Sequence, residues 1–473
     1  MTFDEYVILL FRNGFTIRIY MNNIKIELPS GVAQIIGELN KAGYEAYAVG
    51  GCVRDSILGR NPHDWDITTS AMPLEVKGIF KRTVDTGIKH GTVTVLLGDE
   101  GFEVTTFRVD GEYSDHRHPT DVKFTRNLRE DLLRRDFTIN AMAYSEKTGI
   151  VDIYGGMDDL ENKIIKAVGD PDARFDEDAL RIMRAVRFAA QLGFGIEENT
   201  REAIKRHVKY LEDVSAERIE TELTKLIMSD HPELLIDAYN LGITEIIFPE
   251  FDKMMETPQN TPFHIYDVGR HTIKVLQSVP AEKVLRYAAL LHDIAKPECR
   301  TTDENGVDHF KKHAVYGADK SVLIMKRLRM DNDSIKAVRR LVYWHDYGIY
   351  GDVSKRSLRR MLSEFGAENF QDYLAIRYAD ICGQSDHLKE EKIKNTESIK
   401  KLYDEIIRDK DCFTVKQLDI TGKDIMELGI PAGPKIGEIL NYLLERVMDD
   451  PSLNENDKLK HMIEEHLSNG EGE

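Results

Sequence analysis

The stretch from Tyr47 to Asp66, YAVGGCVRDSILGRNPHDWD, constrains this chain more than any other part of its sequence. A short apolar run that ends in Gly50 and Gly51 predicts a strand, then a tight turn into a helix. Glycines before a helix let the backbone approach a phosphate group and direct free N–H groups towards it. Further on, Asp64 and Asp66 are two residues apart on a predicted strand, so both carboxylates share one face and can share Mg²⁺ ions. The stretch therefore predicts a metal-assisted phosphate site.

The whole pattern is more specific than either of its halves. GGCVRD followed by HDWDITTSA resembles the signature of the DNA polymerase beta nucleotidyltransferase superfamily. Within it, the pattern is similar to the class II tRNA nucleotidyltransferase and bacterial poly(A) polymerase family. The resemblance implies that Asp64 and Asp66 are catalytic and hold two Mg²⁺ ions, the ions that nucleotidyl transfer requires. It also implies that Gly50, Gly51 and Arg54 bind the nucleotide triphosphate.

Two later segments extend the predicted catalytic region. Glu103 lies on an alternating, β-branched strand, where it is either a third catalytic carboxylate or a solvent-facing acid. Arg135 and Asp136 begin RDFTINA, which resembles the RRDFTxNA motif of the same family. The resemblance assigns this pair to the ribose and triphosphate of the nucleotide, and an intrahelical salt bridge is the alternative.

A polar, turn-rich loop separates these two segments and carries Asp115, His116 and Arg117. In the resembled family, a flexible loop at this place helps to exchange CTP for ATP specificity, and enzymes that add only the cytidines are shortened there. The loop has full length here, which argues against addition of the cytidines alone.

The segment from Phe175 to Phe194 predicts a helix with a buried stripe, and Asp178, Arg181 and Arg184 share another of its faces. Cytosine and adenine each present an amino donor beside a ring-nitrogen acceptor, whereas uracil and guanine present the reverse. Because a carboxylate only accepts and a guanidinium only donates, a rigid Asp/Arg pair accepts C and A and rejects U and G. A surface ion pair is the alternative.

The same residues carry a second resemblance. EDALR resembles the EDxxR motif with which class II CCA-adding enzymes select the incoming nucleotide through protein side chains. The resemblance implies that Asp178 and Arg181 recognise the base, and that Glu177 orients the arginine.

Histidines and aspartates recur near predicted helix ends after residue 260, in HIYDVGRHT, LLHDIAKP, KKHAVYGA, YWHDYG and YADICGQS. Imidazole and carboxylate together suit a transition metal with open positions for water. The set resembles an HD-domain phosphohydrolase. The resemblance implies a metal such as Ni²⁺ or Mn²⁺, phosphate contact by Lys296, and hydrolysis of a phosphoester such as a 2′,3′-cyclic phosphate or an RNA 3′-phosphate. The metal ligands that it implies are His271, His292, Asp293 and Asp380, with His313 and His345 for a second ion.

Length and composition set the architecture. A chain of 473 residues with 41% hydrophobic and 31% charged residues predicts several soluble, cytoplasmic domains, and no apolar run approaches the roughly 20 residues that span a bilayer. The net charge of −18 argues against indiscriminate coating of nucleic acid. The fold that the resemblance implies is α+β: a polymerase-beta-like head with a small mixed sheet, then an all-α neck, HD domain and tail. The expected boundaries are 1–27 for an N-terminal extension, 28–150 for the head, 151–260 for the neck, 261–385 for the HD domain and 386–473 for a tRNA-binding tail.

The function that follows is template-independent addition of CCA to the 3′ end of tRNA from CTP and ATP, with a secondary HD phosphohydrolase activity and no membrane partner. Addition of A alone, poly(A) polymerisation, and a phosphohydrolase whose head only binds RNA remain open alternatives. The sequence also leaves open the oligomeric state, the substrate and metal of the HD domain, and whether Met1 or Met21 is the native start.

Overall fold

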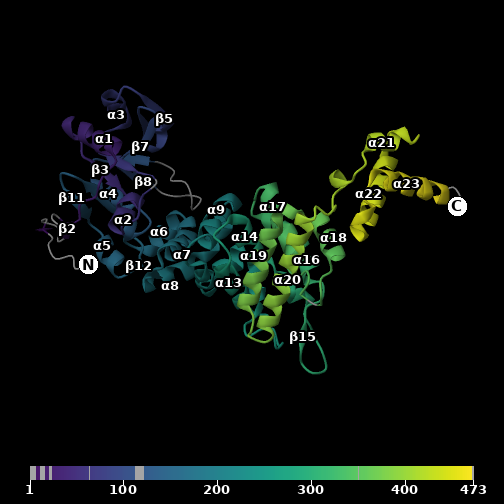
Figure 1. Ribbon diagram of the computed structural model, residues 1–473. Helices are drawn as coiled ribbons and strands as arrows, with labels where there is room; N and C mark the ends of the chain where they lie inside the picture. The colour runs from purple at the N-terminus through teal and green to yellow at the C-terminus, as the bar shows by residue number, and fades with distance from the viewer. Residues whose placement is uncertain are drawn as a thin grey trace. The chain divides into compact units, whose positions relative to one another are not determined.

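The computed structural model describes residues 7–10, 16–20, 24–62, 64–111, 122–349 and 351–470 (Figure 1). Its chain divides into two compact units, residues 1–249 and 250–473. The first unit holds the predicted head and the predicted neck up to residue 249, and the second holds residues 250–260 of that neck with the predicted HD domain and tail. The finer division into five parts stays a prediction.

The head is built on a mixed sheet whose described strands follow the order β1-β2-β11-β10-β3-β4-β7-β6-β5. Only β4 and β7 run parallel, and every other neighbouring pair is antiparallel. β2 pairs with β11, so the described part of the predicted N-terminal extension joins the sheet. The strands are β1 (Val7–Leu10), β2 (Thr16–Tyr20), β3 (Ala46–Val49), β4 (Ile67–Thr69), β5 (Thr83–Gly87), β6 (Thr92–Leu97), β7 (Glu100–Thr106), β10 (Met142–Ser145) and β11 (Gly149–Asp152).

Short helices accompany this sheet, and β8 (Arg108–Asp110) pairs with β9 (Val122–Phe124) beside it. The helices are α1 (Ser30–Lys41), α2 (Gly51–Ile57), α3 (Pro73–Ile79), α4 (Leu128–Leu133), the 3₁₀ turn η2 (Thr138–Asn140) and α5 (Gly156–Glu161). β3 is buried along its whole length, and its Tyr47 stacks on Phe107 with ring centroids 6.5 Å apart. This packing fixes the end of β3, from which the Gly50 turn leaves.

The neck is mostly helical, but the short strands β12 (Ile164–Ile165) and β13 (Gly195–Ile196) pair in parallel within it, so the prediction of an all-α neck was not fully correct. Its central helix α7 carries the predicted buried stripe. Leu180, Met183, Val186 and Ala190 are all buried, as the 3.6-residue period requires. α7 packs on α9. The helices are α6 (Pro171–Glu177), α7 (Leu180–Leu192), α8 (Glu198–His207), α9 (Ala216–Ile227), α10 (Leu235–Asn240) and α11 (Ile243–Ile247).

A buried ion pair joins α7 to α9, and we predict that it contributes strongly to the stability of this unit. Arg187 Nε lies 2.8 Å from Glu222 Oε2, both residues are buried, and the Arg187 guanidinium lies 3.5 Å from the centre of the Phe188 ring. Glu222→Ala leaves a buried cation without its partner, so the free energy of unfolding of this unit should fall by about 3 kcal/mol in urea unfolding. The double variant Arg187→Met/Glu222→Leu should recover most of that loss. A change in Glu222→Ala no larger than in the exposed control Lys225→Ala would contradict this account.

The second unit is helical apart from the small hairpin of β14 (Thr301–Thr302) and β15 (Asp308–His309). No helix in the described part of the chain is long and apolar enough to cross a membrane. The helices are α12 (Pro249–Met255), α13 (Val268–Ser278), α14 (Lys283–Leu291), α15 (Lys296–Cys299), α16 (His313–Arg327), α17 (Asn332–Trp344), α18 (Lys355–Phe365), α19 (Phe370–Gly383), α20 (Lys389–Arg408), α21 (Gly422–Glu427), α22 (Pro434–Asp449) and α23 (Asn456–Gly470).

Candidate functional site

The turn between β3 and α2 holds the backbone against an arginine. Gly50 has φ 86° and ψ −132°, a conformation that residues with a side chain rarely adopt. A Cβ on Gly50 would lie 2.8 Å from Nη1 of Arg135. The positive φ of the turn therefore favours glycine, and a side chain at this position would also displace the Arg135 guanidinium. Gly51 is the first residue of α2.

Asp64 and Asp66 precede the strand that was predicted to carry them. β4 begins at Ile67, so that placement was wrong. The N–H of Val49 nevertheless donates to the carbonyl oxygen of Asp66 at 3.0 Å, so the pairing with β3 reaches Asp66. Asp64 lies beyond this last bond, in the extended segment that leads into β4.

Glu103 lies on β7, next to this segment. In the parallel pair of β4 and β7, Ile67 lies opposite Val104. When this register is continued by one residue towards the N-terminus of each strand, Asp66 lies opposite Glu103. Neighbouring residues of adjacent parallel strands point to the same face of a sheet, and both acids are exposed. The structure thus brings Glu103 and Asp66 together, and the catalytic role of Glu103 stays a prediction.

The electrostatics of Asp66 suit a bound cation. Although Asp66 is exposed as a residue, the surrounding protein desolvates its carboxylate and raises its pKa. The positive charge of Arg135 lowers this pKa, and the negative charge of Asp64 raises it further. Two neighbouring carboxylates, of which Asp66 is partly desolvated, offer only oxygen donors, the kind of site that Mg²⁺ occupies. The residues therefore fit the predicted metal.

A buried network fixes Asp136. Its Oδ2 accepts from Nε of Arg184 at 2.8 Å, and its Oδ1 accepts from Nδ2 of Asn140 at 3.1 Å. Although burial alone would raise the pKa of Asp136, Arg184 and Asn140 hold it well below its usual range. α4 ends at Leu133, before Arg135, so the alternative of an intrahelical Arg135–Asp136 salt bridge is excluded.

Asn140 also accepts from Nη1 of Arg54 at 2.7 Å. The other guanidinium nitrogens of Arg54 donate to Asp55, and Arg54 is buried. Arg54 therefore joins α2 to η2. Its predicted contact with the triphosphate stays a prediction, whereas Asn140, a residue of the RDFTINA segment that had not been singled out, connects Arg54 to Asp136.

Asp178 and Arg181 do not share one helix. α6 ends at Glu177 and α7 begins at Leu180, with Asp178 extended between them, so the prediction of one helical face for Asp178, Arg181 and Arg184 was wrong. The physical reason is local: the Asp178 carboxylate accepts the N–H of Leu180 at 3.1 Å and ends the run of helical backbone there.

Asp178 and Arg181 are each held in position by neighbouring polar groups. Asp178 Oδ2 lies 3.0 Å from Nη2 of Arg218. Arg181 is buried; its Nη1 donates to Oε2 of Glu177 at 2.5 Å and its Nη2 to the carbonyl oxygen of Arg134 at 2.7 Å. Glu177 thus contacts Arg181, and its role in orienting the arginine for base selection stays a prediction. Both side chains are held in place, as selection of a base would require.

The predicted specificity loop cannot be placed. Asp115, His116 and Arg117 lie outside the described residues, and the strands that flank them, β8 and β9, are paired.

The predicted HD ligands converge inside the second unit. His271 comes from α13, His292 and Asp293 follow α14, His313 begins α16, His345 follows α17, and Asp380 lies on α19. His271 Nε2 lies 3.0 Å from Asp380 Oδ1 and 3.5 Å from Asp293 Oδ2. Two groups of ligand atoms, each within 4.8 Å of one another, share Asp293: His271, His292 and Asp293, and Asp293, His313 and His345.

Every imidazole of this cluster has its Nδ1 next to a backbone carbonyl oxygen. The partners and distances are Gly383 at 3.1 Å for His271, Ala289 at 2.8 Å for His292, Phe310 at 2.8 Å for His313 and Val342 at 2.7 Å for His345. Because a carbonyl oxygen only accepts, Nδ1 carries the proton and the lone pair of Nε2 is directed into the cluster. Metal-binding histidines in proteins typically have this arrangement.

The Nε2 atoms also meet one another, at 3.3 Å between His271 and His292 and at 3.1 Å between His313 and His345. Two facing lone pairs at this distance repel unless a cation lies between them. Burial alone would raise the pKa of Asp293, but His292 and Lys296 keep it well below its usual value, so the shared ligand is ionised. The cluster therefore fits two transition-metal ions that share Asp293.

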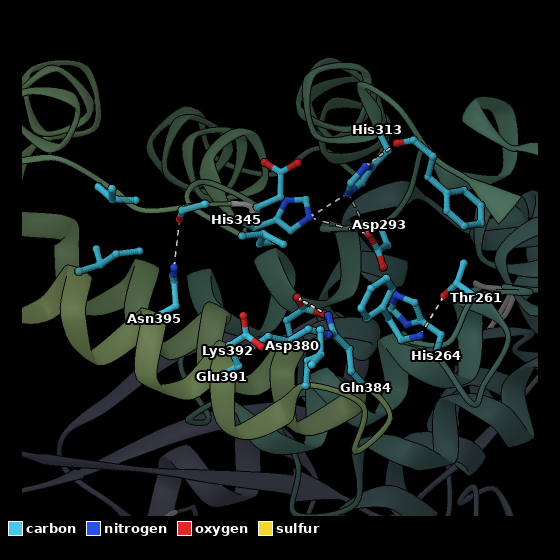
Figure 2. Close-up of a pocket in the computed structure, with 18 of the residues that line it drawn as sticks. Thr261, His264, Asp293, His313, His345, Asp380, Gln384, Glu391, Lys392 and Asn395 are labelled. Atoms are coloured by element: carbon cyan, nitrogen blue, oxygen red, sulfur yellow. Dashed lines mark hydrogen bonds and ion pairs between the residues drawn. The ribbon is translucent and has the colours of Figure 1, made fainter. Parts of the chain in front are cut away.

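A cavity of about 1360 Å³ opens onto this cluster (Figure 2). Asp293, His313, His345 and Asp380 line one part of it, and α20 lines another. These four side chains are therefore accessible from the cavity.

Comparison with known proteins identifies the family. The chain matches three family models: "Poly A polymerase head domain" over residues 46–166, "Probable RNA and SrmB-binding site of polymerase A" over 193–255, and the tRNA nucleotidyltransferase domain 2 over 313–463. Residues 256–312, which include His271, His292 and Asp293, lie outside these three matches.

Two relatives align over most of their length. A CCA-adding enzyme of Pediococcus pentosaceus is 35% identical over 422 residues, which are 89% of this chain and 94% of that protein. A CCA-adding enzyme of Levilactobacillus brevis is 36% identical over the same shares. The crystal structure of the Bacillus stearothermophilus CCA-adding enzyme with CTP superimposes with a TM-score of 0.68 and 28% identity, covering 93% of this chain and 98% of that one. The predicted α+β fold class is confirmed, and the chain belongs to the CCA-adding enzyme family.

Proposed function

We propose that this chain completes tRNA 3′ ends by adding C, C and A from CTP and ATP without a nucleic-acid template. The observation that carries the proposal is its 35% identity to a CCA-adding enzyme along 94% of that protein, together with complete metal and base-selection motifs. The relative from Bacillus stearothermophilus is a complex with CTP.

In the head, Asp64 and Asp66, joined by Glu103, are the residues that would hold two Mg²⁺ ions. Such ions, when bound, activate the terminal 3′-hydroxyl and neutralise the charge of the leaving pyrophosphate. Arg135 lies between the Gly50 turn and Asp66, so its guanidinium is suited to bind the triphosphate beside the carboxylates. Burial lowers the pKa of Arg135, a cost that a bound anion would offset.

In the neck, Asp178 and Arg181 would select the base. Arg218 and Glu177 fix the two side chains, so a wrong base cannot be accommodated by swinging them away. Uracil or guanine would then place acceptor against acceptor and donor against donor, at a cost of roughly 1–3 kcal/mol for each unmet pairing.

This yields a prediction for Asp178→Asn. The amide keeps the size of the side chain and an oxygen for the Leu180 N–H, but it also donates, so it no longer discriminates. Misincorporation of UTP relative to CTP should rise about tenfold to a hundredfold in single-nucleotide extension assays. The exposed neighbour Asp176→Asn serves as the control, and unchanged selectivity in Asp178→Asn would contradict the assignment.

We propose a second activity for the other unit, metal-dependent hydrolysis of a phosphoester. It is favoured by the two ligand groups that share Asp293 and open onto a cavity. Metal ions bound there would activate water. Water adds its oxygen to phosphorus, the ester P–O bond breaks, and the leaving oxygen takes up a proton. A 2′,3′-cyclic phosphate or an RNA 3′-phosphate at a tRNA end is the proposed substrate. Its turnover by Mn²⁺- or Ni²⁺-loaded protein tests the proposal.

A further inference from the structure

Two lysines flank the HD cluster in matching surroundings. Lys296 Nζ lies 2.8 Å from Asp293 Oδ2 and donates to Oε1 of Gln259 at 2.8 Å. Lys392, on α20, donates to Oε1 of Gln384 at 2.5 Å. Each ammonium also lies over a phenylalanine ring, Lys296 at 5.3 Å from the centre of Phe310 and Lys392 at 4.6 Å from that of Phe263.

Gln384 connects the second lysine to the metal ligands. Its Nε2 donates to Oδ2 of Asp380 at 2.9 Å, while its Oε1 accepts from Lys392 (Figure 2). Asp380 and Gln384 are one helical turn apart, so the amide reaches both groups without strain. Lys296 thus touches a metal ligand directly, whereas Lys392 reaches one only through Gln384 and stands one side chain farther from the cluster.

Lys392 has a neutral partner where an ion pair would be expected. In the part of the chain that the structure describes, its ammonium forms no ion pair, although it is half-buried in the cavity wall. Burial lowers the pKa of Lys392, Asp380 opposes this, and Lys296 adds to it. A half-buried cation that also feels the charge of a second lysine is a favourable place for an anion of a ligand.

The cavity has room for more than the group that reacts. Its volume of about 1360 Å³ exceeds the roughly 300–1000 Å³ of pockets for single small ligands. α20 lines it from Glu391 to Glu405, a stretch of about 21 Å at 1.5 Å per residue. Beyond Lys392, the partly exposed apolar side chains of Ile349 and Leu402 offer surface for bases.

We propose that Lys392, oriented by Gln384, binds the phosphate next to the one that is hydrolysed, so that the HD site acts on the end of a ribonucleotide chain in preference to a mononucleotide. The inference rests on the proposed phosphohydrolase activity. Lys296 serves the reacting phosphate, and Lys392 recognises its neighbour. A mononucleotide has no second phosphate for Lys392.

The test uses full-length protein loaded with Mn²⁺ and two substrates, adenosine 2′,3′-cyclic phosphate and the trinucleotide CCA ending in a 2′,3′-cyclic phosphate. Lys392→Ala should raise KM for the trinucleotide about tenfold to a hundredfold, the contribution of one charge-assisted hydrogen bond, and leave kcat and the mononucleotide reaction within about twofold. Lys392→Arg should restore most of the affinity. Lys400→Ala, on α20 but outside the cavity lining, should behave as wild type.

A measurement of Mn²⁺ affinity distinguishes the role of Gln384 from that of Lys392. Gln384→Met should weaken Mn²⁺ binding about tenfold because Asp380 loses its donor, whereas Lys392→Ala should bind Mn²⁺ as wild type does. Equal effects of Lys392→Ala on both substrates, or none on either, would overturn the inference and leave the hydrolase in place. A metal-loaded wild type that hydrolyses neither substrate would refute the hydrolase itself, and the inference with it.

Discussion

Replacing Asp66 by alanine is expected to lower nucleotide addition by at least about a thousandfold, because a metal-assisted transfer that loses a shared ligand loses several kcal/mol of transition-state stabilisation. Asp66 is two residues from Asp64 and next to Glu103 in the register of β4 and β7, and burial of its carboxylate raises its pKa. The measurement is the rate of CTP incorporation into tRNA that lacks its CCA end.

The other activity supplies the control for this variant. Because the HD cluster lies in a separate unit, Asp66→Ala should hydrolyse cyclic phosphate at the wild-type rate. Asp99→Ala, in the exposed turn between β6 and β7, should keep nucleotide addition. Full addition by Asp66→Ala would remove Asp66 from the metal site.

Asp293→Asn is expected to abolish phosphoester hydrolysis and spare nucleotide addition, the reverse of Asp66→Ala. Asp293 belongs to both groups of metal ligands and is buried, so loss of its charge weakens both sites at once. Phosphoester hydrolysis should fall by at least about a thousandfold, and nucleotide addition should stay within about twofold. Hydrolysis is measured with Mn²⁺ present at saturation for the wild type.

Two controls accompany Asp293→Asn. The exposed Asp319→Asn, on α16 of the same unit, should hydrolyse normally. After chelation, Mg²⁺ alone should restore nucleotide addition, whereas hydrolysis should require Mn²⁺ or Ni²⁺, because a histidine-rich site prefers transition metals. Normal hydrolysis by Asp293→Asn would place the activity elsewhere or attribute it to a contaminant.

The residues of the HD cluster can be singled out from the sequence because they occupy short motifs near helix ends, and their binding of metal stays a prediction. His292 and Asp293 are adjacent, and an apolar helix in front of them fixes where they emerge. What it could not predict is the carbonyl oxygen that each Nδ1 meets, because His271, for example, contacts Gly383, which is 112 residues away. Such partners follow from tertiary packing and have no local pattern.

Asp178 shows a different limit. Helical periodicity placed it on the face of Arg181, but its own carboxylate competes for the N–H of Leu180 and separates α6 from α7. The base-selection chemistry did not depend on that placement, since it requires one acceptor and one donor, whichever backbone carries them.

The sequence alone does not single out Gln384 or Lys392 as residues of the site. Gln384 follows Asp380 in YADICGQS, and Lys392 lies in a charged helix that reads as an ordinary solvated surface. Only the folded chain brings α20 against Phe263 and Gln384. An amide four residues after the predicted metal ligand Asp380, directly after the end of its helix, is the one signal that could have singled out Gln384.

The most direct test of the central claim uses purified protein, Mg²⁺ and tRNA transcripts that end before the tail, after the first C or after both Cs. Each nucleoside triphosphate is supplied singly and in combination, and products are resolved at single-nucleotide length. The account predicts that every transcript is extended to CCA and no further, with UTP and GTP refused. A ladder of adenosines would make the chain a poly(A) polymerase, extension of the CC-ended transcript alone would make it an A-adding enzyme, and no extension at all would contradict the transferase assignment.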